Sequence, residues 1–499
     1  MKRGPMHALA ILVVALFGSA NDAAAADKVL TVAASVFPDN LKAGTLTYAG
    51  LSLVAQTNDF LVTRDNKGDL QPALATSWEP IDPTTMRFHL RQGVKFSDGV
   101  EFTADDVVFT LNRVQDPKAA YGQAARISQV QSTTAVDKYT VDIKTKSIFP
   151  TLTLGLSDIL IEPKHYYEKV GAEMVASHPM GTGPFIFQEW VPGDHYTLRR
   201  NRDYWAGAPK IDRLLIRAIP DGASRVAALV SGEAQIIEEV PVDLIDQVNA
   251  SGTARIDEIG TTVGLVLTFN PTIKPFDNPK IREAFDYAID KPLIFKQILK
   301  GLGELLQGQV LTKGVIGWNP DLKARPYDPA KAKRMLQEAG YDFNTPVVLT
   351  TLNGKYVSDT DISNAAAGML NQIGVKATVE IVEGGVFQQM TTSQKWGALH
   401  VNGWYSLGDA DFAAVWYTKG GGRTLWIDPE YERLFVVARS TLDKAEREKT
   451  YHQMMAILNQ QNPALFLFGL PSLYGVGKNV SGFGAASDKI LRLTQVELK

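Results

Sequence analysis

Cysteine is absent from all 499 residues of this sequence. The chain therefore forms no disulfide bond, and thiol catalysis and thiolate metal sites are excluded. The net charge is only −3 and no lysine run or basic stripe is present, so nothing indicates a nucleic-acid partner. The seven histidines are dispersed without the spacing of metal ligands, and we expect neither a metal nor another cofactor.

Long apolar runs are also absent, except for one near the N-terminus. Lys2 and Arg3 precede an apolar run at 8–17, and the small residues 24–26 follow it. This pattern is typical of a cleavable secretory signal, and the run is short for a membrane span. We expect residues 1–26 to be a signal peptide, with a retained anchor as the alternative. No cysteine follows for lipid attachment, so we expect a periplasmic protein that is not lipid-anchored.

The motifs of common enzyme classes are missing as well. The sequence has no His-Glu-x-x-His, no Gly-x-Ser-x-Gly, no phosphate-binding loop and no dinucleotide fingerprint. Adjacent carboxylates such as Glu238-Glu239 point in different directions, and we interpret them as helix caps or surface. We therefore predict that the protein is not an enzyme. A secreted glycoside hydrolase with carboxylates from distant positions remains an alternative, as does a chaperone-like binder of unfolded chains.

The most informative stretch that is present spans residues 90–109 and reads L-R-Q-G-V-K-F-S-D-G-V-E-F-T-A-D-D-V-V-F. Alternating apolar residues from Phe88 to Phe96 predict a half-buried strand. Asp98-Gly99 predicts a turn, and Thr103 is a plausible N-cap for the helix that follows. These residues form scaffold and carry no chemistry themselves.

This stretch closely resembles the signature of the peptide-type class of extracellular solute-binding proteins, which includes dipeptide, oligopeptide and nickel binders. Gly-Thr-Gly-Pro-Phe at 181–185 and Asn-Arg-Asp-Tyr-Trp at 201–205 follow in the order of the same family. The resemblance covers almost the whole mature chain. It implies a binding protein that captures a small-molecule or peptide ligand and delivers it to an inner-membrane ABC permease, and we expect a monomer.

The resemblance also implies the fold: an α/β, two-lobed periplasmic-binding-protein fold of type II (Venus-flytrap) with an extra β-rich domain in the first lobe. The chain is expected to cross between the lobes near 266–271 and to return near 465–471. The expected divisions are a signal peptide at 1–26, lobe I at 27–63, 178–265 and 470–499, the extra domain at 64–177, and lobe II at 266–469.

Candidate ligand-binding residues lie on loops at the ends of predicted strands, where aromatic side chains supply contact area at little entropic cost. Trp404 and Tyr405 are expected to form apolar walls and Asn270 to be a hydrogen-bonding hinge residue. Core packing is the alternative for the tryptophans. The full candidate set is Phe37, Asn270, Lys355, Tyr356, Trp404, Tyr405, Asp409, Asp411 and Trp426.

The charged candidates Lys355, Asp409 and Asp411 bear on which charged groups the ligand carries. The resemblance implies that Lys355 stands near the place of an arginine that grips a peptide carboxylate, although a solvated surface lysine is an equal alternative. It also implies an aspartate soon after Gly403-Trp404, but the first acid here is Asp409. Either Asp409 or Asp411 has taken that role, or the ligand carries no free amine. We expect a peptide-like or other small organic solute, with an opine, a sugar conjugate or an oligosaccharide as alternatives.

Overall fold

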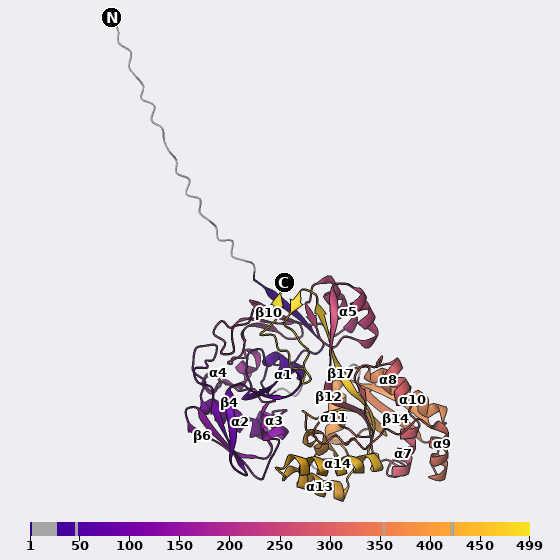
Figure 1. Ribbon diagram of the computed structural model, residues 1–499. Coiled ribbons are helices and arrows are strands. Elements are labelled where there is room, and N and C mark those ends of the chain that lie inside the picture. The colour runs from indigo at the N-terminus through magenta and orange to yellow at the C-terminus, as the bar shows by residue number, and fades with distance from the viewer. Residues whose placement is uncertain (2–26, 45–47, 353–354, 420, 422–423) are drawn as a thin grey trace.

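Two long strands form the centre of the molecule in the computed structural model, which describes residues 1, 27–44, 48–352, 355–419, 421 and 424–499 (Figure 1). They are β12 (Ala254–Phe269) and β17 (Ala464–Gly477), which pair antiparallel along most of their length. Within the described residues they join one eleven-stranded sheet that runs through both lobes. Its order is β15-β14-β16-β12-β17-β11-β1-β10-β9-β8, and β13 also pairs with β17. The two-lobed α/β fold expected from the sequence is confirmed. Below, lobe I, the inserted domain and lobe II denote the segments proposed above.

Lobe I holds one end of this sheet. Parallel pairing joins β1 to both β10 and β11, which places the carboxyl ends of the three strands at one edge. The elements are β1 (Val29–Ala34), α1 (Tyr48–Val54), β8 (Phe185–Val191), β9 (His195–Arg200), β10 (Arg213–Ala218), α5 (Gly222–Ser231), β11 (Ile236–Ile237), η3 (Val242–Leu244), α6 (Ile245–Ala250), β18 (Val480–Ser481) and β19 (Glu497–Leu498).

The inserted domain has its own four-stranded sheet, in the order β4-β5-β7-β6, and its own hydrophobic core. Thr103 is the N-cap of α2 as predicted, and its backbone N–H donates to the Asp106 carboxylate at 2.9 Å. The elements are β2 (Val62–Arg64), β3 (Leu70–Pro72), β4 (Ala75–Asp82), β5 (Thr85–Leu90), α2 (Ala104–Gln115), η1 (Pro117–Ala119), η2 (Ala124–Ile127), β6 (Val130–Asp137), β7 (Thr140–Thr145), α3 (Leu152–Leu156) and α4 (Lys164–Ser177).

Lobe II covers both faces of its part of the sheet with helices. Five of these helices begin after an Asp or Asn whose side chain accepts a backbone N–H of the first turn, which fixes their starts. The elements are α7 (Pro279–Tyr287), α8 (Lys291–Gln297), β13 (Glu304–Leu305), α9 (Pro329–Glu338), β14 (Pro346–Leu352), α10 (Asp359–Gln372), β15 (Lys376–Val382), α11 (Gly384–Ser393), β16 (Leu399–Tyr405), α12 (Asp411–Ala414), η4 (Val415–Tyr417), α13 (Pro429–Arg439) and α14 (Lys444–Gln461).

The packing along β12 bears on where the chain crosses between the lobes. Ile259 packs against the core of lobe I, whereas Val263 belongs to the core of lobe II. Between them the pairing of β12 with β17 shifts register, from Gly260 to Gly264. An irregular ladder is where two paired strands bend most easily. A second register shift lies between Leu265 and Val266, at the start of the crossing expected near 266–271. That crossing stays a prediction, and the packing of Ile259 and Val263 favours an earlier one at 260–263.

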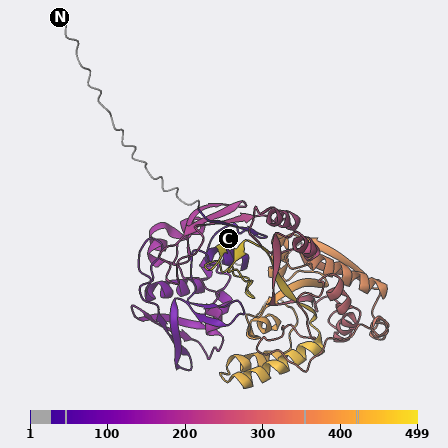
Figure 2. The same cartoon turned by 45° about the horizontal axis from the view of Figure 1, so that its top comes forward.

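The inserted domain and lobe II also meet at the outer rim. They lie on opposite sides of the central strands (Figures 1 and 2). The Thr151 hydroxyl lies 3.4 Å from a carboxylate oxygen of Asp411, and the Arg126 guanidinium lies 5.0 Å from the ring centroid of Phe412. The space between the lobes is thus bounded by the hinge strands on one side and by this contact on the other.

Candidate ligand-binding site between the lobes

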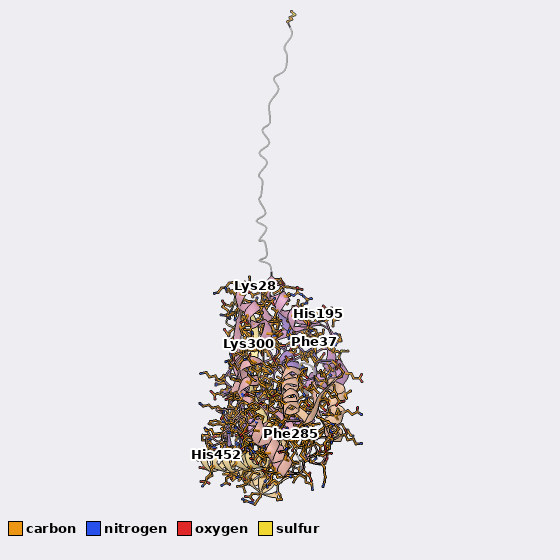
Figure 3. All side chains as sticks on the ribbon, turned by 90° about the vertical axis from the view of Figure 1, so that its right-hand side faces the viewer. Lys28, Phe37, His195, Phe285, Lys300 and His452 are labelled. Atoms are coloured by element: carbon orange, nitrogen blue, oxygen red, sulfur yellow. The ribbon has the colours of Figure 1, made fainter. Side chains whose placement is uncertain are left out.

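In lobe I, the ends of two parallel neighbours, β1 and β11, bring residues together at one edge of the sheet. Phe37 follows β1, is half-buried and packs against the core of lobe I, in the upper part of the molecule in Figure 3. Glu238 and Glu239 follow β11, and the Glu238 backbone N–H donates to Ala33 of β1 at 3.0 Å. Ligands of open α/β sheets bind at the carboxyl ends of the strands, so this edge is where a ligand is expected.

In lobe II, the matching edge is formed by β14 and β16, which are also parallel. Lys355 and Tyr356 follow β14, and Tyr405 ends β16. The Tyr356 ring covers Gly403 so closely that a Cβ there would lie 2.4 Å from the ring. The Lys355 ammonium lies 5.3 Å from the ring centroid of Tyr356. The structure therefore brings three of the predicted residues to one edge.

The two edges meet at an ion pair that the sequence did not single out. The Lys489 ammonium, from the loop after β18, donates to the Glu239 carboxylate at 2.7 Å. Burial by itself lowers the pKa of Lys489, but the facing Glu239 carboxylate and the Tyr405 phenol outweigh it and raise the pKa, so the lysine stays charged. Burial raises the pKa of Tyr405, and Lys489 opposes that rise. A charged pair of lobe I thus faces a phenol of lobe II.

Beside this pair lies a cavity of about 690 Å³ whose walls come from both lobes. Drug-sized ligands occupy pockets of about 300–1,000 Å³, so the volume suits a small to medium organic solute. Asp488 precedes Lys489 and lines the cavity, as do Leu407 and Gly408, which follow Tyr405 closely. The same two segments therefore border the cavity and the ion pair. None of the nine predicted residues lines the cavity itself.

The two aspartates have partners within lobe II. The Asp411 carboxylate accepts two hydrogen bonds from the Arg439 guanidinium, at 2.6 and 2.8 Å. Asp409 forms a buried ion pair with Arg447 and also accepts the Asp411 backbone N–H at 3.0 Å. An acid that is already matched by an arginine needs no ligand amine. The expectation that Asp409 or Asp411 serves a ligand amine is therefore corrected to a structural role.

Trp404 and Tyr405 point to opposite faces of β16, because side chains alternate along a strand. Trp404 is 2% exposed and stacks on Trp416, with ring centroids 5.4 Å apart, inside a core of lobe II. Trp426 is buried in the same core, edge-on to Tyr431. Core packing, the alternative, therefore holds for Trp404 and Trp426, and neither forms a wall of the cleft. Tyr405 faces the space between the lobes.

Asn270 lies away from the hinge. It follows the last residue of β12, where its side-chain amide donates to the Trp396 carbonyl at 3.1 Å and its oxygen accepts from the backbone N–H and hydroxyl of Thr272. These bonds fix the start of the loop after β12, in which Asn270 is buried and residues 272–274 are exposed. The expected hinge role is not supported, because both register shifts of β12, at 260–264 and 265–266, precede Asn270, and its side-chain partners Trp396 and Thr272 both belong to lobe II.

Glu238 and Glu239 were interpreted as caps or surface, and this is wrong for Glu238. Its side chain is 6% exposed, and burial together with the neighbouring Glu239 raises its pKa to about 7. Lys489 carried no motif that could have identified it. Both Glu239 and Lys489 have left-handed backbone, with φ of 49° and 60°, which no sequence pattern marked for a non-glycine residue.

Two further findings concern membrane-spanning helices and metal sites among the described residues. None of their helices combines the length and apolarity needed to cross a bilayer. Within the same residues, no group of three or more His, Asp or Glu side chains is placed to hold a metal ion.

Strand ends of two lobes that face one another, beside a cavity with walls from both lobes, are typical of a two-lobed binding protein. The chain belongs to the bacterial extracellular solute-binding proteins of family 5, whose middle region matches residues 69–424. The glutathione-binding protein GsiB of Escherichia coli K12 is 28% identical over 441 residues, which cover 85% of each chain. AgaA of A. tumefaciens R10, solved with agropinic acid, superposes with a TM-score of 0.84 at 26% identity over 94% of this chain and 99% of its own.

The fold is shared more widely. The periplasmic binding protein DppA of Helicobacter pylori, solved with the peptide STSA, superposes with a TM-score of 0.85 at 24% identity. That comparison covers 94% of this chain and 98% of DppA. The recognition of the peptide-type class from residues 90–109 is confirmed by the family match.

Proposed function

We propose that this protein captures a peptide-like or other small organic solute between its lobes and delivers it to an inner-membrane ABC importer. The observation that carries the proposal is that strand ends of both lobes meet where the Glu239–Lys489 pair of lobe I faces Tyr405 of lobe II. Lobe closure around a ligand is favoured only by the ligand's higher affinity for the closed state. The irregular pairing at 260–264 is the proposed hinge.

The ligands of related proteins support a small to medium organic solute. The GsiB protein is named for binding glutathione, and DppA and AgaA were solved with the peptide STSA and with agropinic acid. A cavity of about 690 Å³ accommodates molecules of this kind. We propose Phe37, Lys355, Tyr356 and Tyr405 as contacts, together with Glu239 and Lys489. These residues lie at the facing strand ends and do not line the cavity itself. An opine, a sugar conjugate or an oligosaccharide is the alternative within the same family.

The proposed protein works without catalysis, as a monomer in the periplasm. Its relatives are binding proteins, and the Asp409 and Asp411 carboxylates each form an ion pair with an arginine of lobe II. The proposed signal peptide at 1–26 lies outside the described residues, apart from its first residue. Secretion, processing to Asp27 and partnership with a permease are parts of the proposal.

Native mass spectrometry of the mature protein tests the function. We expect a bound organic compound to leave on gentle unfolding and to restore the original mass when it is added back. Calorimetry with Met-Leu, glutathione, agropinic acid and an oligosaccharide then assigns the class. Stoichiometric binding without product supports transport. Turnover of a glycoside panel would contradict it and favour the hydrolase alternative.

A further inference from the structure

Two arginine–phenylalanine contacts join the inserted domain to lobe II at the outer rim, and they run in opposite directions. The Arg126 guanidinium of the inserted domain lies 5.0 Å from the ring centroid of Phe412 in lobe II. In return, the Arg439 guanidinium of lobe II lies 5.7 Å from the ring centroid of Phe149 in the inserted domain. A guanidinium is attracted to an aromatic face within about 6 Å of its centroid. Each side of the rim thus supplies one cation and one ring.

Phe412 is buried without belonging to a core of its own lobe. Its side chain is 4% exposed, yet it is part of none of the hydrophobic cores that the described residues form. The next two residues, Ala413 and Ala414, do belong to a core of lobe II. A large apolar side chain that is buried outside a core, beside a cation of the other lobe, marks a surface that is covered only while the lobes are together.

Two ion pairs within lobe II fix the segment that carries Phe412. The Asp411 carboxylate accepts two hydrogen bonds from the Arg439 guanidinium of α13, and Asp409 forms an ion pair with Arg447 of α14. The segment is therefore held against two helices at once, and it presents Phe412 to the other lobe from a rigid support. The same pairing with Asp411 also orients the Arg439 guanidinium.

On the facing side, close packing fixes the backbone of Arg126. A Cβ at Gly155 of α3 would lie 2.4 Å from the Arg126 carbonyl oxygen, so the glycine allows η2 to pack directly on α3. The Arg126 guanidinium also approaches the Asp158 carboxylate, at 3.5 Å. Thr151 precedes α3 and places its hydroxyl 3.4 Å from the Asp411 carboxylate of lobe II. Both surfaces of the rim contact are thus supported by contacts within their own lobe.

The rim contact lies on the far side of the interlobe space from the hinge strands. Rotation about a hinge moves each point in proportion to its distance from the hinge, so the rim moves most when the lobes open. At 5.0 and 5.7 Å, both arginine–phenylalanine separations are close to the limit of attraction. An opening of only about 1–2 Å at the rim therefore breaks both contacts. The rim contact exists only in the closed arrangement of the lobes.

We propose that Arg126, Phe149, Phe412 and Arg439 form an interlobe latch, in which two reciprocal cation–π contacts stabilise the closed arrangement whichever solute lies between the lobes. This inference rests on the proposed function and goes beyond it, because it assigns positioning residues for closure. None of the four lines the cavity. Each contact is made only when the lobes are together, so the latch shifts the equilibrium between open and closed forms toward the closed form.

The absence of cysteine allows the separation of the lobes to be measured with introduced labels alone. Val136→Cys on the inserted domain and Leu293→Cys on lobe II attach spin labels at side chains that are 48% and 46% exposed. Double electron–electron resonance is then recorded on the mature protein as purified, after removal of bound material, and with added Met-Leu, glutathione, agropinic acid or maltotriose. We expect a shorter and a longer distance between the labels, and the shorter one marks the closed arrangement.

Phe412→Leu removes the ring and keeps an apolar side chain. In every sample where the unsubstituted protein shows the shorter distance, we expect this variant to lower the ratio of closed to open molecules about 2- to 30-fold. Arg126→Gln is expected to act similarly. Because the two residues share one contact, the double variant should lower the ratio by less than the product of the two single effects. Phe149→Leu should also lower the ratio, but Phe149 belongs to the core of the inserted domain, so Phe412→Leu is the decisive variant.

Phe109→Leu is the matched control. The Arg113 guanidinium lies 5.6 Å from the ring centroid of Phe109, almost the separation between Arg439 and Phe149, but both residues belong to the inserted domain. Its substitution removes the same kind of contact without touching the junction of the lobes. The ratio of closed to open molecules is therefore expected to stay unchanged.

The outcomes separate the latch from the proposed function. An unchanged ratio in Phe412→Leu, while the lobes still close in at least one sample, overturns the latch and leaves solute capture intact. A loss in Phe109→Leu equal to that in Phe412→Leu overturns it as well, as does a double variant whose effect is the full product of the single effects. If the shorter distance appears in no sample, the lobes do not close, and both the latch and the proposed function fail.

Discussion

Asp409→Asn separates a structural aspartate from a ligand-binding one. Asp409 is 2% exposed and Arg447 is 6% exposed, so the substitution leaves a buried guanidinium without its counter-charge. Breaking a buried ion pair by removing one partner costs about 3–5 kcal/mol. We expect the free energy of unfolding of lobe II to fall by that amount in urea titrations followed by tryptophan fluorescence. Affinity for Met-Leu, or for the compound recovered from the protein, is expected to stay within a few-fold when it is measured on folded protein.

Two further variants serve as controls for the loss of stability in Asp409→Asn. Glu430→Gln breaks the exposed pair with Arg433 on α13 and is expected to cost less than about 0.5 kcal/mol. The double variant Asp409→Leu with Arg447→Met removes both buried charges and is expected to recover much of the loss. The reasoning is refuted if Asp409→Asn leaves the free energy of unfolding unchanged but weakens the binding of Met-Leu and not that of N-acetyl-Met-Leu. That result would show that Asp409 binds the amine of the ligand.

Two other predictions concern Glu238 and the centre of the sheet. Burial, with Glu239 beside it, raises the pKa of Glu238 from 4.5 to about 7, so the folded protein holds this proton more tightly than the unfolded chain. The free energy of unfolding should therefore fall by on the order of 2–3 kcal/mol between about pH 4.5 and 7, and Glu238→Gln should flatten that part of the profile; parallel profiles would contradict it. Gly264→Ala places a Cβ 2.2 Å from the Val310 carbonyl oxygen and should cost about 1–3 kcal/mol in chemical denaturation. Gly368→Ala, on α10 with nothing within 4 Å, should instead stabilise by up to about 1 kcal/mol, and equal effects at the two sites would refute the packing argument.

Much of the scaffold was predictable because its signals are local. The cap at Thr103 depends on neighbours within one helical turn, and it forms as expected. The family signature at 90–109 combines turn, cap and apolar positions, so it identified the class from one stretch. The place of the crossing between the lobes stays a prediction, because β12 is one continuous strand that is marked only by two irregularities in its pairing with β17.

The candidate site was only partly predictable, for two physical reasons. Strand alternation turns Trp404 into the core while Tyr405 faces the other lobe, a distinction that a position on a strand end cannot make without the strand's register. Charge pairing is non-local: Asp409 meets Arg447 and Glu239 meets Lys489 only after folding, across 38 and 250 positions. A lone aspartate or lysine therefore looks equally free in the sequence whether or not a partner awaits it.

The central claim is that two lobes close over a solute that leaves unchanged. Small-angle X-ray scattering of the ligand-free mature protein, repeated with the compound recovered from it, tests this directly. We predict a smaller radius of gyration with the compound and recovery of that compound at its original mass. Identical scattering curves at saturating compound, or recovery of a cleaved product, would contradict the account.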